Sequence, residues 1–447
     1  MAAPPVDFSD YDQYGFRIES QFVSRSQWQR AEQESAKSAA KHAVKWKEMI
    51  LSNGGYLPDR SEKVKKMIRK GVPPPLRRNV WFEYSGAKVR MKANPGVYAA
   101  MLAREQQSLD AGIRPANEHI DIIERDLHRT FPDNLHFKRT PIPNCPPPPY
   151  TDPSAPPSPA DPLVNHLRRV LVAFSFFNTE IGYCQSLNYI VGLLLLFMPE
   201  EEAFWMLVVM CEDLLPHGMY SKSLSGTITE MKVFKDIVRE KCKTLVEKVQ
   251  AGGIVDLDML VSPWFLTIYV NILPVEAALR TWDCFFFEGN KILYRIALAI
   301  LKLAEDDVSK LKDPMEVVQY IQNAPKRMVD AEKLMKTAFQ RFGSKAVGKL
   351  SHHDIDNKRD KEISRQSMER ARSESGRSNG AGGGGSSNGG LQASSAGGGN
   401  GFLSAGRRSD GGASSLNASA SNSRAGSASY VSGASTPTGS ASISSYR

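Results

Sequence analysis

The chain has 447 residues, of which 41% are hydrophobic and 23% charged, and its formal net charge is +9. This composition is typical of a soluble globular protein with enough apolar residues for a large core. The mild positive charge comes without a basic block interleaved with aromatic residues, so nucleic-acid binding is not expected. Five widely spaced cysteines without a CxxC pair argue against a disulfide framework or a zinc site and favour a reducing, cytoplasmic compartment.

The first expected element is a helix over residues 24–51, rich in Ala, Lys, Glu and Gln. It begins with serines suited to N-capping and ends at the Asn-Gly-Gly that follows, and we interpret it as a surface helix leading into the main domain. A short helix over 64–69 stops at glycine and prolines, and a helix over 76–84 comes next. Apolar positions three and four residues apart then recur almost to Phe342, while strand signals are scarce. The main domain is therefore predicted to be all-α and multi-helical.

A proline-rich insertion over residues 139–162 interrupts this helical pattern. Proline is excluded from helix and strand interiors and favours exposed polyproline II, so we expect a loop between two core helices. Its segment PPPPY, Pro146 to Tyr150, has the composition of a ligand for an SH3 or WW domain. A plain spacer is the alternative interpretation.

A long apolar run over residues 189–198 is the only candidate for a membrane helix. Pro199 and three glutamates interrupt it before apolar residues resume at 203–211. A membrane helix needs about 20 apolar residues without such a break. We therefore expect two buried helices joined by an acidic turn, with the glutamates at the start of the second helix, where the macrodipole is positive.

The C-terminal segment differs in composition from the rest of the chain. Of the 34 glycines, 18 lie in residues 376–447, among many Ser, Ala and Asn. Such a segment buries too little apolar surface to offset its ordering entropy. The predicted organisation is a partly helical N-terminal extension (1–62), a helical domain (63–342) and a disordered Gly/Ser-rich tail (343–447).

Common catalytic signatures are absent: the sequence has no phosphate-binding GxxxxGK[ST], no HExxH and no GxSxG. Cys184 has no histidine near it in sequence and is interpreted as a small core residue rather than a nucleophile. His352 and His353 border the predicted tail, so a metal role there is not expected.

Two polar islands remain within the apolar helices, and the first contains Ile123, Asp126 and Arg129. At about 100° per residue these positions share one side of a helix, so Ile123 anchors in the core while Asp126 lies beside Arg129. Phe131 precedes a proline, so the helix is expected to end there, with Arg129 in its last turn. Taken alone, the Asp126–Arg129 pair is most often a solvated salt bridge.

The second island contains Gly182, Tyr183, Gln185 and Asn188. Gly182 is expected to supply a turn, and residues 183–188 the first turn of the next helix, with their polar side chains at a rim rather than in the core. An exposed amide there can position a water or a partner group. The alternative is a helix-capping turn with a packed tyrosine.

Taken in order, IERDLHR (Ile123 to Arg129) and GYCQSLN (Gly182 to Asn188) closely resemble the IxxDxxR and YxQ signatures of the TBC domain family of Rab GTPase-activating proteins. The resemblance extends over roughly residues 63–342. It departs from the family at Ser186-Leu187, where Gly-Met is frequent, and at the proline-rich insertion. Further similar blocks are Gly71-Val-Pro73 with Arg77 or Arg78 and Trp81, TFPDN (Thr130 to Asn134), SPWFLTIY (Ser262 to Tyr269), Leu273-Pro274 and LRTWDCFFFEG (Leu279 to Gly289).

The resemblance implies an all-helical domain that binds a GTP-loaded Rab and supplies two catalytic side chains in trans. Arg129 is the implied arginine finger and Gln185 the implied glutamine finger; Asp126 orients Arg129, Tyr183 braces the turn that carries Gln185, and Ile123 supports the helix from the core. The chain is then an activator of another protein's GTP hydrolysis, not a hydrolase on its own. It needs no cofactor, because the GTPase carries GTP and Mg²⁺.

The same resemblance implies a role in vesicle trafficking and a cytoplasmic protein that is peripheral on endomembranes through its Rab. Two other classes stay open. One is a catalytically silent Rab-binding scaffold. The other is a helical membrane tether, which is disfavoured because the sequence has no basic amphipathic anchor or lipidation signal.

Overall fold

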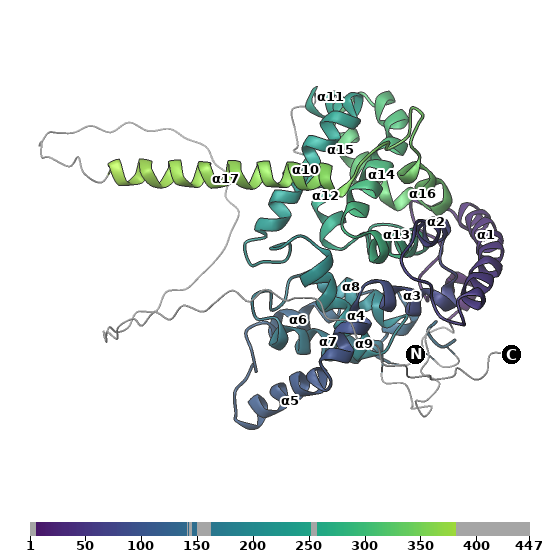
Figure 1. The fold of residues 1–447 in the computed structure, drawn as a ribbon, viewed down its shortest axis with the longest axis vertical. Coiled ribbons are helices and arrows are strands. Elements are labelled where there is room, and N and C mark those ends of the chain that lie inside the picture. Colours follow the sequence, from purple (N-terminus) through teal and green to yellow (C-terminus); the bar gives the residue numbers. More distant parts are fainter. Residues whose placement is uncertain (1–5, 141, 143–144, 150–161, 252–256, 381–447) are drawn as a thin grey trace, which may run out of the picture. The chain divides into compact units, whose positions relative to one another are not determined.

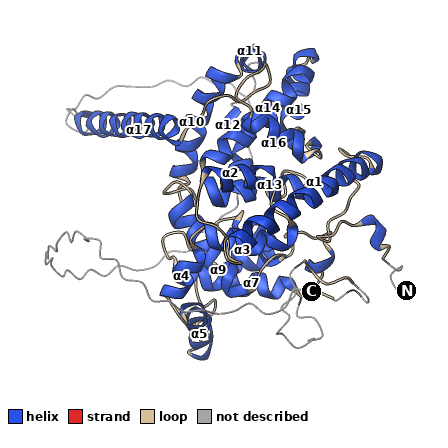
Figure 2. Cartoon of the chain, turned by 45° about the vertical axis from the view of Figure 1, so that its right-hand side comes forward, coloured by secondary structure: helices blue, strands red, loops and turns tan. Residues whose placement is uncertain are grey.

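The computed structural model describes residues 6–140, 142, 145–149, 162–251 and 257–380. Within these ranges the regular elements are helices, and extended pairing is limited to two isolated bridges, so the predicted all-α fold is confirmed (Figure 2). The α-helices are α1 (Arg25–Ser52), α2 (Glu62–Lys70), α3 (Arg77–Tyr84), α4 (Ala87–Ala93), α5 (Val97–Asp110), α6 (Ile120–Leu127), α7 (Leu163–Phe177), α8 (Leu187–Leu195), α9 (Glu200–Val209), α10 (Ser225–Lys241), α11 (Lys243–Ala251), α12 (Leu257–Leu266), α13 (Val275–Glu288), α14 (Lys291–Lys310), α15 (Pro314–Asn323), α16 (Ala331–Phe339) and α17 (His352–Gly380).

The helices form two groups that follow the order of the chain. Helix α7 packs against α5, α6, α8 and α9 at one end, whereas α14 packs against α11, α13 and α16 toward the other (Figure 1). Helix α13 also contacts α2 and α3, so it joins the later group to the earlier one. The predicted site residues lie in and beside α6 and α8, two helices that contact each other and α7.

Helix α1 begins and ends where the sequence predicts. Ser24 and Gln27 form a capping box, in which each side chain accepts a hydrogen bond from the other residue's backbone. Near its other end, the buried Trp46 donates its indole N–H to the Gly71 carbonyl at 3.1 Å. Helix α1 is thus a surface helix that is fixed to the start of the domain by a buried indole.

The apolar run around residue 190 forms two buried helices, as predicted. Helix α8 ends at Leu195, and three glutamates occupy the first turn of α9. Among the described helices, none combines the length and the apolar character needed to cross a bilayer.

The first part of the predicted tail is structured, which corrects the boundary at residue 343. Helix α17 begins at His352, and its Ile355 is fully buried. The guanidinium of Arg359 pairs with Glu230 on α10, and Glu362 pairs with Lys232. Composition alone missed this helix because its contacts with α10 consist largely of charged pairs. Residues 381–447 lie outside the described ranges.

Two other predicted segments are only partly within the described ranges. The predicted N-terminal extension is packed on the domain before α1 begins, with Tyr14, Ile18 and Val23 buried. In the proline-rich insertion, residues 145–149 are described and are not helical. Tyr150, the last residue of the proposed SH3 or WW ligand, lies outside the described ranges.

Candidate functional site

Helix α6 places the first polar island with one face in the core. Ile123 and Asp126 are both completely buried, as the helical spacing predicts for Ile123. The helix ends at Leu127, however, so the prediction that it continues to Phe131 with Arg129 in its last turn is wrong. Thr130 donates its hydroxyl to the Asp126 carbonyl at 2.7 Å, and Phe131 has a positive φ of 46°. Arg129 therefore lies in a tight turn that follows the helix.

The Arg129 guanidinium forms an ion pair with the Asp126 carboxylate. The Arg129 side chain is 46% exposed, whereas that of Asp126 is only 1% exposed. This asymmetry distinguishes the pair from a solvated surface salt bridge, because a buried carboxylate requires partners to offset its lost hydration. The pair holds the base of an arginine whose end remains accessible.

Tyr183 connects the second polar island to the same carboxylate. Its buried hydroxyl donates to Asp126 Oδ2 at 2.5 Å, although the two residues are 57 positions apart in sequence. Burial and the Asp126 charge raise the pKa of Tyr183 far above its usual value, so the hydroxyl remains a donor. Asp126 thus pairs with the Arg129 guanidinium in the turn after α6 and accepts a hydrogen bond from Tyr183 in the turn before α8.

A second link between the islands runs through Asn188. This fully buried residue donates its amide to Thr130 Oγ1 at 2.8 Å and accepts from the Ser186 backbone N–H at 3.2 Å. The expectation that the island's polar side chains all lie at a rim is therefore wrong for Tyr183 and Asn188. Tyr183 bonds to Asp126 in α6, and Asn188 bonds to Thr130 in the turn that follows this helix. Thr130 lies in the TFPDN block, but its part in the site was not predicted from the sequence.

Gln185 is exposed, as predicted. The sequence predicted that residues 183–188 form the first turn of the next helix, but α8 begins only at Leu187. Residues 183–186 form a turn before the helix instead. In the part of the chain that the structure describes, the Gln185 side-chain amide makes no hydrogen bond. The turn therefore presents an amide with free donors and acceptors close to a buried, cross-linked base.

Gly182 starts this turn with a φ of 59°, which confirms its predicted role. A Cβ added there would lie 1.9 Å from Nε2 of His119, the residue that precedes α6. A side chain at position 182 would therefore require the His119 ring to move. His119 is a site-supporting residue that sequence analysis missed, and the only available signal was the need for glycine at a turn.

Other candidate chemistries gain no support from the geometry. Burial raises the pKa of the Cys184 thiol to about 11, so it is not a thiolate nucleophile near neutral pH. His352 contacts the Glu288 carbonyl oxygen through Nε2 at 2.7 Å. Within the described residues, no three His, Cys, Asp or Glu side chains are grouped in a way that suits a metal ion.

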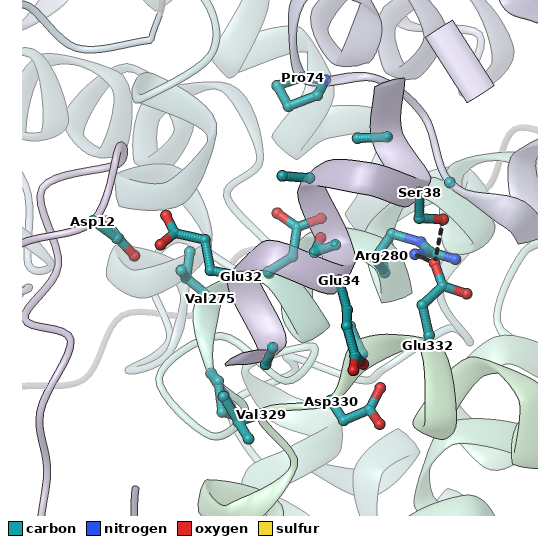
Figure 3. A pocket seen from close by; sticks show the side chains of 18 of the residues that line it. Asp12, Glu32, Glu34, Ser38, Pro74, Val275, Arg280, Val329, Asp330 and Glu332 are labelled. Carbon is teal, nitrogen blue, oxygen red and sulfur yellow. Dashed lines mark hydrogen bonds and ion pairs between the residues drawn. The ribbon is translucent and has the colours of Figure 1, made fainter. Parts of the chain in front are cut away.

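A cavity of about 250 Å³ lies where α1 faces the start of α13 and α16, and none of the predicted site residues lines it. Figure 3 shows its carboxylates, among them Glu32, Glu34 and Asp330. At one side, Glu332 accepts hydrogen bonds from Arg280 at 2.5 Å and from Ser38 at 3.2 Å. These contacts attach α1 to the later helices.

Residues 149–308 match the model of the Rab-GTPase-TBC domain, a range that includes Tyr183 and Gln185 but not Arg129. Growth hormone-regulated TBC protein 1 of Xenopus laevis is 32% identical over 325 residues, which are 72% of this chain and 85% of that protein. GTPase-activating protein GYP3 of Saccharomyces cerevisiae is 29% identical over 415 residues, which cover 78% of this chain and 63% of GYP3.

Among solved structures, the chain is similar to the Chlamydomonas flagellar RabGAP TBC domain. The two are 34% identical with a TM-score of 0.59, and the match covers 74% of this chain and 99% of that domain. This similarity in fold agrees with the sequence relationship to growth hormone-regulated TBC protein 1. The chain therefore belongs to the TBC domain family.

Proposed function

We propose that this chain is a GTPase-activating protein for Rab-family small GTPases and that it supplies Arg129 and Gln185 to the GTP site of its partner. The observation that carries the proposal is the Asp126 carboxylate, which binds Arg129 from one loop and Tyr183 from the other. Relatives are named GTPase-activating proteins, which supports the same conclusion.

The chemistry of GTP hydrolysis suits these two side chains. The transferring phosphoryl group gains charge that must be stabilised, and an arginine finger contributes about 1,000- to 100,000-fold in rate. A guanidinium is always charged and planar, and its several donors can bridge phosphate oxygens. The Gln185 amide can accept a hydrogen bond from the attacking water while donating one to a phosphate oxygen.

Burial of the supporting residues would hold Arg129 and Gln185 in position before the partner binds. Ile123, Asp126, Tyr183 and Asn188 are buried, so the loops rest on packed side chains while Arg129 remains accessible. Catalytic groups that are held in place before the partner arrives lose less entropy when they act. GTP and Mg²⁺ come with the GTPase, and the activator acts in vesicle trafficking, in the cytoplasm or on endomembranes through its Rab.

The proposal is tested by single-turnover GTP hydrolysis with a panel of purified Rab GTPases, each with and without the full chain. We expect Arg129→Ala to reduce acceleration by about 1,000-fold or more and Gln185→Ala by about 100-fold. Arg129→Lys should also lose most activity, because an ammonium does not bridge oxygens as a guanidinium fork does.

Two surface replacements serve as matched controls. Arg125→Ala removes an arginine from the exposed side of α6, and Gln107→Ala removes an exposed glutamine from α5. Both should leave acceleration unchanged. GTP-dependent binding of a Rab without acceleration would instead favour the catalytically silent scaffold, and wild-type activity in Arg129→Lys would remove Arg129 from the mechanism.

A further inference from the structure

Residues 11–23, which we call the strap, cross the domain before α1 begins. Tyr11 and Arg17 form an isolated antiparallel β-bridge. Between them, Asp12 Oδ1 accepts hydrogen bonds from the backbone N–H groups of Tyr14 at 2.8 Å and Phe16 at 2.9 Å. Gly15 completes this turn with a φ of 80°. The strap therefore has a defined local fold of its own.

The buried Tyr14 attaches the strap to the domain. Its hydroxyl donates to Glu276 at 3.2 Å and accepts from Arg77 at 2.8 Å. Arg77 and Glu276 belong to α3 and α13 and also pair with each other at 2.6 Å. The attachment is a buried polar network that joins the strap to both α3 and α13.

The strap is also bonded to the segment that follows Arg129. The Gly15 carbonyl accepts the Leu135 N–H at 3.0 Å, and the Tyr14 carbonyl accepts the Asn134 side-chain amide at 2.9 Å. A Cβ at Gly15 would lie 2.8 Å from the His136 ring, so the two backbones are in close approach. The strap is therefore fastened to residues 134–136 by two hydrogen bonds and a close contact.

The strap also contacts Phe131, which lies only two residues after Arg129 in sequence. Its ring lies edge-on to Phe16 of the strap, with centroids 5.0 Å apart, and is 5.8 Å from the Tyr189 ring on α8. A Cβ at Gly192 of α8 would lie only 2.8 Å from the same ring. Phe131 is therefore enclosed between the strap and α8.

The backbone of Phe131 requires this enclosure. A φ of 46° is unfavourable for an aromatic residue and persists only where the surroundings fix it. The Thr130 hydroxyl and the Arg129 carbonyl, which Tyr189 contacts at 3.4 Å, precede this residue directly. Release of Phe131 would allow the turn that carries Arg129 to relax.

We propose that the strap is a positioning element for Arg129 and that Phe16 is its positioning residue. By holding Phe131 against α8, Phe16 keeps the Arg129 turn in the one backbone arrangement that places the guanidinium on Asp126. The proposal rests on the proposed function, since positioning is measured as GTP hydrolysis by the partner.

The first test is Phe16→Ala in the full chain, with single-turnover hydrolysis measured over a range of activator concentrations. We expect the maximal rate to fall by about 10- to 100-fold, because small misplacements of catalytic groups are costly. The half-saturating concentration should change by less than about twofold, because Phe16 acts through the turn and not on the partner. Phe16→Tyr keeps the ring and should restore most of the rate.

Phe22→Ala is the matched control. Phe22 is also a half-buried residue of the strap, but it contacts a different residue: the Lys326 Nζ lies over its ring, 4.9 Å from the centroid. It should keep the wild-type maximal rate. An equal loss in Phe16→Ala and Phe22→Ala would reduce the effect to general destabilisation and overturn the proposal.

A second measurement is independent of GTP hydrolysis. Amide hydrogen exchange of the peptide covering residues 127–137 should be faster in Phe16→Ala than in wild type, and unchanged in Phe22→Ala. Unchanged exchange in Phe16→Ala, or faster exchange with a full maximal rate, contradicts the positioning role. If the wild-type chain accelerates no Rab, the proposed function fails, while exchange still decides whether the strap holds the Arg129 turn.

Discussion

The hydroxyl of Tyr183 is the donor that joins the two loops at Asp126. A hydrogen bond to a buried charged group contributes more than one between neutral groups, because the carboxylate has no water to replace its partner. Tyr183→Phe should therefore lower the free energy of unfolding by about 1.5–3 kcal/mol, measured by urea denaturation. It should also lower the maximal rate of GTP hydrolysis, since Asp126 would lose a partner that fixes it.

Tyr320→Phe provides the comparison for this replacement. The Tyr320 hydroxyl also donates to an aspartate, Asp307, at 2.6 Å, but the pair is exposed. Solvent can replace the lost partner there, so the loss should be no more than about 1 kcal/mol. Equal losses in the two variants would show that burial of the Tyr183–Asp126 bond adds nothing.

Gly182 tests the packing between the start of α6 and the turn before α8. Gly182→Ala combines an unfavourable positive φ with a collision against His119, so it should destabilise by about 2–5 kcal/mol. Gly96→Ala has a similar φ of 76° and open space around its Cβ, and it should lose only about 1–2 kcal/mol. Thermal unfolding of both variants separates the collision from the backbone strain.

For single residues, the sequence predicted positions along one helix better than contacts with other segments. The helical spacing correctly placed Ile123 in the core and Asp126 beside Arg129. It did not reveal that Tyr183 reaches the same carboxylate or that Asn188 is buried, because both contacts join segments far apart in sequence. Periodicity carries information about one helix at a time.

Among the elements, α9 shows how a helix terminus is fixed by charge. Burial would raise the pKa of Glu200 in its first turn, but hydrogen bonds from Arg169, His166 and Tyr98 outweigh it and lower the pKa to about 2. A lowered carboxyl pKa contributes stability that is complete above the unfolded value, near 4.5, and is lost as the pH falls toward 2.

Glu200→Gln isolates this contribution. The wild-type chain should lose about 3 kcal/mol of stability from this group between pH 6 and pH 2, and the variant should lack that part of the pH dependence. Urea denaturation of both proteins across this range provides the measurement. Parallel pH profiles would show that the carboxylate does not anchor α9.

Helix α17 is the element that sequence composition placed wrongly. Its stability on the domain should depend on Ile355, which is fully buried, so Ile355→Ala is expected to lose about 2–5 kcal/mol. Ile363→Ala is the control on the same helix, because Ile363 is 48% exposed and its truncation should change stability by no more than about 0.5 kcal/mol. Denaturation of the full chain distinguishes them, and similar small effects would mean that α17 contributes little.

Other elements were predicted closely where local signals were strong. The Ser24 cap and the glycines after Ser52 gave the limits of α1, and the acidic turn at Pro199 gave the division between α8 and α9. The end of α6 was placed too late because the Thr130 side chain, and not the proline after Phe131, terminates the helix. Such side-chain competition with the backbone is invisible in apolar periodicity.

The resemblance between motifs did not reveal every segment that packs on the helices of the predicted domain. The predicted domain began at residue 63, yet Tyr14 and Trp46 are buried against it and bonded to its residues. The strap, α1 and α17 all pack on helices of the predicted domain: the strap on α3 and α13, α1 on α2 and α16, and α17 on α10. Their contacts join residues far apart in sequence, such as Tyr14 and Glu276, which are 262 positions apart, and no local pattern encodes pairings of that range.

The carboxylate of Asp126 also determines how this surface can fail. Because Arg129 and the Gln185 turn depend on one buried group, damage to either loop reaches the other, and the two are not redundant. Effects of replacing residues in both loops should then combine by less than their sum, as expected for groups that act as a unit. Replacement of Asp126 alone should therefore disturb the Arg129 turn and the Gln185 turn at the same time.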